Sequence, residues 1–151
     1  MKRNLYKLLG KAISIATEAH AGQFDKGGRP YILHPLHLMN QLSYDVELMI
    51  IAVLHDVVED SDWTIGGLRN EGFTKRVVSA VARLTHRPDD SYDHYIFRVG
   101  TNYDALRVKR KDLEHNSCIT RLKGVTSKDL ERAEKYHKAF MYLGEQREKF
   151  L

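Results

Sequence analysis

The chain has 151 residues, of which 42% are hydrophobic and 29% charged, and its formal net charge is +4. This ordinary globular composition and length predict one domain over residues 1–151. No apolar run reaches the roughly 18 residues that cross a bilayer, and the charged first residues lack the apolar stretch of a signal peptide. A single cysteine excludes an internal disulfide framework, so we expect a cytoplasmic protein.

The N-terminal segment shows the spacing of apolar residues that is typical of a helix. Apolar residues recur at this spacing over 5–21, and the following stretch, 22–30, holds three glycines and a proline that no helix can cross. Pro35 favours the first turn of a second helix, which makes His34 its cap residue, and this helix is predicted to run to about Ser43.

The rest of the chain is also predicted to be helical. Tyr44 and Asp45 turn the chain into a central helix that continues through Asp60. Capping residues and apolar spacing then predict a short helix from about 61 to 72, helices over 74–85, 91–99 and 105–118, and a long final helix from 126. No stretch shows the alternation of a strand, so the predicted fold class is all-α, in a single domain.

The central helix carries the most informative pattern in the chain. Five apolar residues, 50–54, lead into His55 and Asp56, and Glu59 and Asp60 follow one turn later. In a continuous helix, this spacing places each carboxylate of the second pair above one member of the first pair. Buried charges are costly unless they are paired or bind metal. Two explanations stay open, a metal site with an activated water and a core helix that ends in a solvated acidic turn.

A metal site needs ligands from several parts of the chain, because two adjacent side chains cannot surround an ion. Beside His55 and Asp56, the candidate ligands are His34 at a helix start and Asp112, which shares a helix face with Asn116. Two histidines and two carboxylates leave coordination positions open for water and substrate. This donor set suits manganese or iron better than calcium.

Four ordered motifs carry a resemblance to a known family. They are Ala-His-Ala-Gly-Gln at 19–23, Pro-Tyr-Ile-Leu-His-Pro at 30–35, Leu-His-Asp-Val-Val-Glu-Asp at 54–60 and Asp-Leu-Glu-His-Asn at 112–116. Together they resemble the hydrolase domain of RelA/SpoT proteins, within the HD-domain metal-dependent phosphohydrolases, and the resemblance runs over about 5–143. The small stand-alone members, including the metazoan SpoT homologue, are similar in size.

The resemblance implies an HD-type helical bundle and a manganese-dependent enzyme that hydrolyses the 3′-pyrophosphate of (p)ppGpp, which yields GDP or GTP and pyrophosphate. It assigns the metal to His34, His55, Asp56 and Asp112. It assigns the positioning and deprotonation of the attacking water to Glu59 and Asp60. Substrate contacts are implied for Lys26, Tyr31 and Asn116.

Two sites depart from the family pattern. Asp25 stands where the long bifunctional members usually have an arginine that stacks on guanine, so recognition of the base is left open. Arg110 and Lys111 replace an apolar pair, and we expect both side chains to be solvated. The alternatives are therefore an HD phosphohydrolase for another nucleotide, such as a nucleoside phosphatase or an NADPH phosphatase, and a metal- and nucleotide-binding module without turnover. Intact Glu59 and Asp60 disfavour the module, since a pure sensor needs no water-activating pair.

The expected partner is a phosphorylated nucleotide. A modest positive charge suits this ligand, and no basic stripe with interleaved aromatic residues indicates nucleic acid. No membrane partner is expected, and the sequence does not determine an oligomeric state. Cys118 is expected to be a small buried residue and not a ligand. We expect His37 to be a packing or surface residue and His86, His94 and His137 to be exposed.

Overall fold

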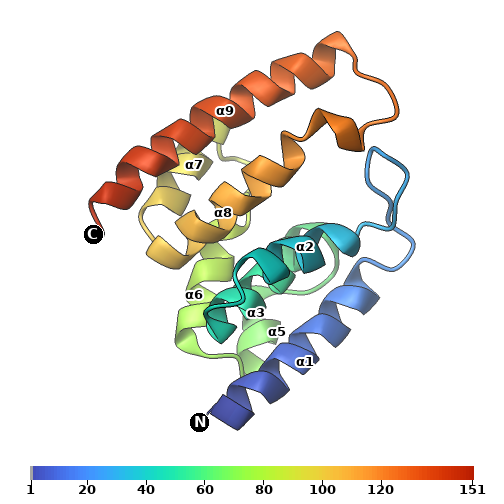
Figure 1. Ribbon diagram of the computed structural model, residues 1–151. Coiled ribbons are helices and arrows are strands. Elements are labelled where there is room, and N and C mark those ends of the chain that lie inside the picture. The colour runs from blue at the N-terminus through green and yellow to red at the C-terminus, as the bar shows by residue number, and fades with distance from the viewer. Residues whose placement is uncertain (1) are drawn as a thin grey trace.

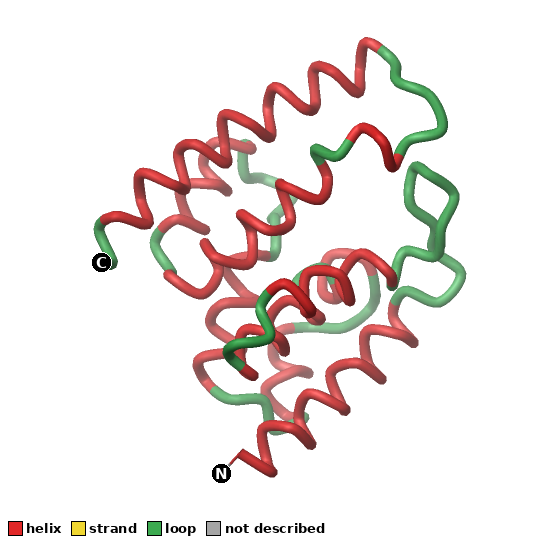
Figure 2. The backbone as a smooth tube through the Cα atoms, in the orientation of Figure 1, coloured by secondary structure: helices red, strands yellow, loops and turns green. Residues whose placement is uncertain are grey.

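The chain folds into a bundle of helices (Figure 1). The computed structural model describes residues 2–151. Its helices are α1 (Lys2–Ala19), α2 (Leu33–Gln41), α3 (Val46–Leu54), α4 (Val57–Asp60), α5 (Ile65–Asn70), α6 (Lys75–Leu84), α7 (Tyr92–Gly100), α8 (Tyr103–Asn116), the 3-10 helix η1 (Ile119–Arg121) and α9 (Ser127–Glu148). Within this range the only β pairing is an isolated bridge between Phe24 and Pro30, and Figure 2 shows helices joined by loops. The predicted all-α fold class is confirmed.

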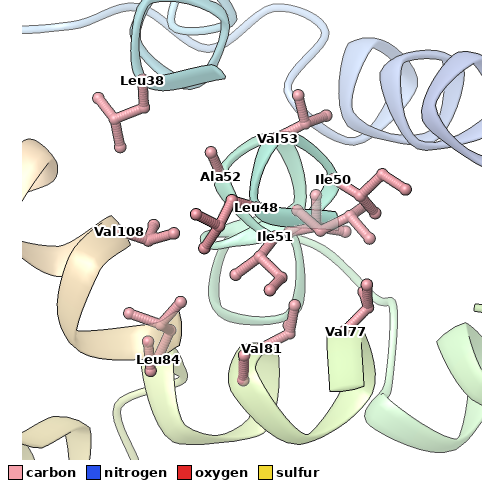
Figure 3. Close-up of a cluster of buried hydrophobic side chains, with 14 of the residues drawn as sticks. Leu38, Leu48, Ile50, Ile51, Ala52, Val53, Val77, Val81, Leu84 and Val108 are labelled. Atoms are coloured by element: carbon pink, nitrogen blue, oxygen red, sulfur yellow. The ribbon is translucent and has the colours of Figure 1, made fainter. Parts of the chain in front are cut away.

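The helix α3 lies at the centre of the core. Residues 50–54 are wholly buried, because this helix is apolar on all sides and packs against α1, α2, α6 and α8. Figure 3 shows α3 surrounded by Leu38 of α2, Val77 and Val81 of α6, and Val108 of α8. Burial of one such side chain contributes roughly 1.5–3 kcal/mol, so α3 anchors the bundle.

The other helices form two groups around this core. In Figure 1, α7, α8 and α9 lie together on one side, and α1, α2, α5 and α6 surround α3 on the other. The helix α8 joins the groups, because it contacts α2, α3 and α6 as well as α9. The loop between α1 and α2 and the segment around η1 approach each other at one edge (Figures 1 and 2). None of the helices in residues 2–151 has the length and apolar character to cross a membrane.

Capping residues place most helix starts where the sequence predicts them. The hydroxyl groups of Thr64 and Ser91 accept backbone hydrogen bonds at the starts of α5 and α7. Thr126 caps α9 and forms a reciprocal capping box with Asp129. The end of α1 at Ala19 is slightly earlier than predicted, and the chain then turns through a left-handed glycine at the start of the predicted loop.

The prediction of a continuous central helix is wrong. The helix α3 ends at Leu54 and α4 begins at Val57, with His55 and Asp56 in a turn between them. The His55 ring donates from Nδ1 to the Ala52 carbonyl at 2.7 Å. This bond occupies the acceptor that the Asp56 N–H would use in an unbroken helix, so the helix is interrupted there.

The prediction that His34 caps α2 is also wrong. Ile32 occupies the N-cap position, and His34 lies within the first turn of the helix. Its side chain is almost fully buried and contacts α8 through Asp112. The histidine therefore has a rigid position on a packed helix, which is better suited to a ligand than a loop position.

Candidate metal centre and adjoining cleft

Three buried side chains from separate elements meet at one point. They are His34 of α2, His55 in the turn after α3, and Asp112 of α8. One nitrogen or oxygen atom from each lies within 4.8 Å of the others. The Oδ1 atom of Asp112 is 2.8 Å from His34 Nε2 and 3.5 Å from His55 Nε2. Two imidazoles and a carboxylate at this spacing form a candidate site for a divalent metal.

Asp56, the fourth predicted ligand, lies beside His55. Its Oδ2 atom is 2.9 Å from His55 Nε2 and accepts a hydrogen bond from the Tyr31 hydroxyl. Burial alone would raise the pKa of Asp56, but His55 and the Tyr31 hydrogen bond outweigh burial and lower this pKa to about 2. Burial and Asp56 raise the pKa of Tyr31, so its hydroxyl stays protonated and orients the carboxylate.

The His55 ring fits the role of a metal ligand. Its Nδ1 atom donates to the Ala52 carbonyl. Its buried Nε2 atom lies 2.9 Å from Asp56 Oδ2, but the geometry of a hydrogen bond is not met by this or any other described residue. A carbonyl on the outer nitrogen is the arrangement that orients metal-binding histidines. Burial lowers the pKa of His55, but Asp56 and Asp112 raise it well above its usual value. The two carboxylates thus favour positive charge at this point, which a divalent cation would also supply.

Lys109 belongs to this centre, although it is not among the predicted site residues. Its ammonium group lies 2.7 Å from Asp112 Oδ2, and the Asn116 amide donates to Oδ1 at 2.9 Å. Burial would raise the pKa of Asp112, but Lys109 and the two histidines hold it well below its usual value. The spacing of three residues between Lys109 and Asp112 on one helix is the signal that could have identified this pair.

The neighbouring basic residues of α8 do not face the centre. Lys111 pairs with Glu114 at 3.3 Å on the surface, as expected for a solvated residue. Arg110 is half-buried and packs over the Phe140 ring at 4.1 Å, so the prediction that it is solvated is wrong. An aromatic ring on α9 covers its guanidinium, and this contact lies too far along the chain for sequence spacing to show it.

Two further histidines extend the cluster beyond the predicted ligands. The Nδ1 atom of His115 lies 2.7 Å from that of His34, and the His37 ring stacks on His115 with centroids 4.0 Å apart. Burial and the charge of Arg121 lower the pKa of His115 to about 4, so this ring is neutral near neutral pH. From the sequence, His115 stands beside Asn116 and a place in the pocket is left open for it.

The predicted catalytic pair lies on α4, directly after the turn that carries Asp56. Glu59 accepts a hydrogen bond from the backbone N–H of His86, which is half-buried and not exposed as predicted. Partial burial raises the pKa of Glu59, and Asp56 adds to this effect. Burial and Asp56 also raise the pKa of Asp60. Both carboxylates are therefore better proton acceptors than solvated ones.

A cleft of about 310 Å³ adjoins the centre, and His34 lines both. The three predicted substrate contacts, Lys26, Tyr31 and Asn116, all line this cleft. Two further cations, Arg121 and Arg132, lie on its wall and were not predicted. Asp25 and Asp129 also line the cleft, and each pairs with one of these arginines, at 3.3 Å and 2.9 Å. The three cations outnumber these two carboxylates, so the cleft can receive an anionic ligand next to the candidate metal centre.

Apolar side chains also line the cleft. Phe24, Ile119 and Leu122 line it, and the Phe24 side chain is 66% exposed. Cys118 is exposed and lines the same cleft, so the prediction that it is buried is wrong. It lies in the connection after α8, where no helix face is available to bury it.

The loop that carries Asp25 packs against η1. Asp25 Oδ2 is 3.3 Å from the Arg121 guanidinium, and Oδ1 accepts from the Arg29 backbone at 2.9 Å. Burial would raise the pKa of Asp25, but these partners lower it. A Cβ atom on Gly27 would clash with the Arg121 carbonyl oxygen, so only glycine permits this close contact. Asp25 therefore holds the loop in place and brings Arg121 into the cleft.

No family model matches the chain. The bifunctional (p)ppGpp synthase/hydrolase SpoT of Escherichia coli K12 is 39% identical over 124 residues, which covers 73% of this chain and 18% of SpoT. The chain is a relative of one segment of SpoT. A 3′-pyrophosphohydrolase of guanosine-3′,5′-bis(diphosphate) from Haemophilus influenzae is 40% identical over 75 residues, or 46% of this chain and 11% of that protein. The match thus spans less than a fifth of either SpoT-type relative.

One solved structure has a similar fold over almost the whole chain. It is a metazoan orthologue of SpoT that hydrolyses ppGpp, and the comparison covers 94% of this chain and 92% of that chain with a TM-score of 0.75. Sequence identity is 19%, so this likeness concerns the fold. The predicted HD-type helical fold and the resemblance to SpoT-type proteins are confirmed.

Proposed function

We propose that this chain is a metal-dependent hydrolase that removes the 3′-pyrophosphate of (p)ppGpp and releases GDP or GTP. The observation that carries the proposal is a cluster of two histidines and two carboxylates that adjoins a cleft lined by cations. The names of the SpoT-type relatives describe (p)ppGpp hydrolysis, and the metazoan structural neighbour hydrolyses ppGpp. The side-chain cluster with its cleft and the activities named for the relatives both support (p)ppGpp as the substrate.

Manganese is the metal that the family resemblance implies, and the two imidazole nitrogens disfavour calcium and magnesium, which prefer oxygen ligands. The residues that would hold it are His34, His55, Asp56 and Asp112. When bound, the ion would lower the pKa of a water molecule and neutralise phosphate charge. Tyr31 orients Asp56, and Lys109 holds the second oxygen of Asp112.

Glu59 and Asp60 are the proposed acceptors of the water proton. Burial and the nearby charge of Asp56 raise the pKa of both groups. A carboxylate with a raised pKa is a stronger base at neutral pH while it remains largely ionised. The His86 backbone fixes Glu59, and the Asp60 carbonyl accepts from the Gln23 side chain at 2.9 Å, so both residues have defined positions.

The cleft provides the proposed contacts to the nucleotide. Lys26, Arg121 and Arg132 supply positive charge for phosphate groups, and Asn116 lies at the junction of cleft and metal centre. The apolar wall that includes Phe24 suits a planar base, which it would contact without hydrogen-bond readout. We therefore expect weak discrimination between guanine and adenine.

A nucleotide panel tests this function. The purified chain is incubated with Mn²⁺ and, separately, ppGpp, ppApp, GMP or NADPH, and products are separated by ion-exchange chromatography. The proposal predicts that ppGpp and ppApp each lose the 3′ group as pyrophosphate. Release of inorganic phosphate from GMP or NADPH alone would favour a nucleoside or NADPH phosphatase. Binding of ppGpp without any product would favour a module without turnover.

A further inference from the structure

His115 has a fixed position beside a proposed metal ligand. Its ring and that of His34 are nearly parallel, with centroids 4.9 Å apart and the two Nδ1 atoms separated by 2.7 Å. The His37 ring stacks on His115 as well, and Arg121 donates to the His115 carbonyl at 2.8 Å. The stacking contact positions the His115 ring and the Arg121 contact positions its backbone, so the hydrogen bond to His34 has a defined geometry.

Only one direction of this hydrogen bond is compatible with metal binding. His34 Nε2 lies in the metal group, 2.8 Å from Asp112 Oδ1, and must be unprotonated to bind an ion. A neutral His34 ring then carries its proton on Nδ1 and donates it to His115 Nδ1. If His115 donated to His34 Nδ1 instead, a neutral His34 ring would carry its proton on Nε2, and this atom could not bind the metal.

We infer that His115 is a positioning residue that fixes the tautomer and the ring orientation of His34 for metal binding. Metal-binding histidines usually donate their outer N–H to a carboxylate, a carbonyl or water. A neutral imidazole accepts the bond without adding negative charge beside Asp56 and Asp112, which already repel each other. The inference rests on the metal site proposed above and concerns a residue outside its ligand set.

Two substitutions separate the hydrogen bond from ring packing. His115→Phe keeps a flat ring for stacking but removes the acceptor, whereas His115→Asn removes the ring and keeps an amide oxygen that can accept from His34. His37→Phe is the matched control, because that histidine stacks on the same ring and makes no side-chain hydrogen bond within residues 2–151. Mn²⁺ affinity is measured by isothermal titration, and melting temperatures without metal check that each variant folds.

His115→Phe should weaken Mn²⁺ binding by about 10–100-fold, the usual loss when an outer partner of a ligand is removed. His115→Asn and His37→Phe should stay within about threefold of the unmodified chain, less than a typical hydrogen bond contributes. Equal affinity of His115→Phe and the unmodified chain would overturn this inference alone, as would equal losses in His115→Phe and His115→Asn. If the unmodified chain binds no Mn²⁺, the proposed metal site fails and this inference fails with it.

Discussion

Among single residues, Glu59 gives the sharpest separation of metal binding from catalysis. Glu59→Gln keeps the size of the side chain but removes the charge that accepts a proton. We predict that Mn²⁺ affinity is retained and that kcat for ppGpp falls about 100-fold or more. Glu114→Gln, on the exposed face of α8, is the control and should change neither quantity. An unchanged kcat in Glu59→Gln would assign proton transfer to Asp60 alone.

Phe24 is the residue that tests recognition of the base. Its exposed ring lines the cleft, so Phe24→Ala should raise KM about fivefold or more for ppGpp and ppApp alike, because stacking on one base contributes roughly 1–3 kcal/mol. The kcat values should change little, since the ring lines the cleft and belongs neither to the candidate metal ligands nor to the proposed proton acceptors. Phe97→Ala removes a comparably exposed ring on α7 and serves as the control. A KM effect confined to ppGpp would mean that a polar group reads guanine.

The candidate ligand residues were more predictable than the residues that contact them. His34, His55 and Asp112 stand in recognisable motifs, and the structure brings their side chains together. Lys109 and His115 act through contacts that depend on which faces of α2 and α8 meet. Packing across the core sets those contacts, and the spacing of residues along the chain does not specify this packing.

At the scale of elements, the contact between the α1–α2 loop and η1 shapes one wall of the cleft. Gly27→Ala should push the loop away from the Arg121 carbonyl, because the added Cβ atom would clash with backbone that cannot yield cheaply. We predict a rise in KM for ppGpp of about tenfold, comparable to the loss of one charge-assisted contact, with kcat and melting temperature nearly unchanged. Gly124→Ala, which meets open space, should leave KM unaffected. A normal KM in Gly27→Ala would show that the loop position does not control substrate binding.

The helices could be predicted well wherever a cap and an apolar face agreed, as at Ser91 and Thr126. The break between α3 and α4 could not, because the run of apolar residues continues the helical pattern up to His55. The interruption comes from one side-chain hydrogen bond to the Ala52 carbonyl. That bond depends on the ring conformation of His55, which helical periodicity does not report.

On the scale of the whole molecule, a charge cluster joins three helices at the end of the core opposite the metal centre. The Arg76 guanidinium of α6 lies 2.8 Å from Asp45 and Glu47 at the start of α3 and 2.9 Å from Asp104 at the start of α8. Arg76→Met should lower the free energy of unfolding by about 1 kcal/mol, because partial exposure screens these pairs. The melting temperature should fall by about 2–4 °C, less at high salt, with unchanged Mn²⁺ affinity. A loss of melting temperature that is the same at low and high salt would point to packing of the arginine stem as the cause.

The fold class followed from the sequence because apolar residues recur at helical spacing in almost every segment, and α3 is apolar on all sides. The arrangement of the helices did not follow, since α8 contacts α2, α3 and α6 across long separations in the chain. It is this arrangement that brings Asp112 to His34 and His55. The candidate metal centre is therefore a property of the packed molecule, although each candidate ligand lies in a short motif.

The most direct test of metal-dependent hydrolysis measures pyrophosphate release from ppGpp as Mn²⁺ is added to metal-free protein, with samples quenched by a chelator and separated by ion-exchange chromatography. We predict no release without metal and a rise in rate that saturates when one ion is bound per chain. Asp56→Ala should lose both the ion and the activity, because the centre lacks a carboxylate that faces His55. Release at the full rate in metal-free protein, or full metal occupancy and activity in Asp56→Ala, would contradict the account.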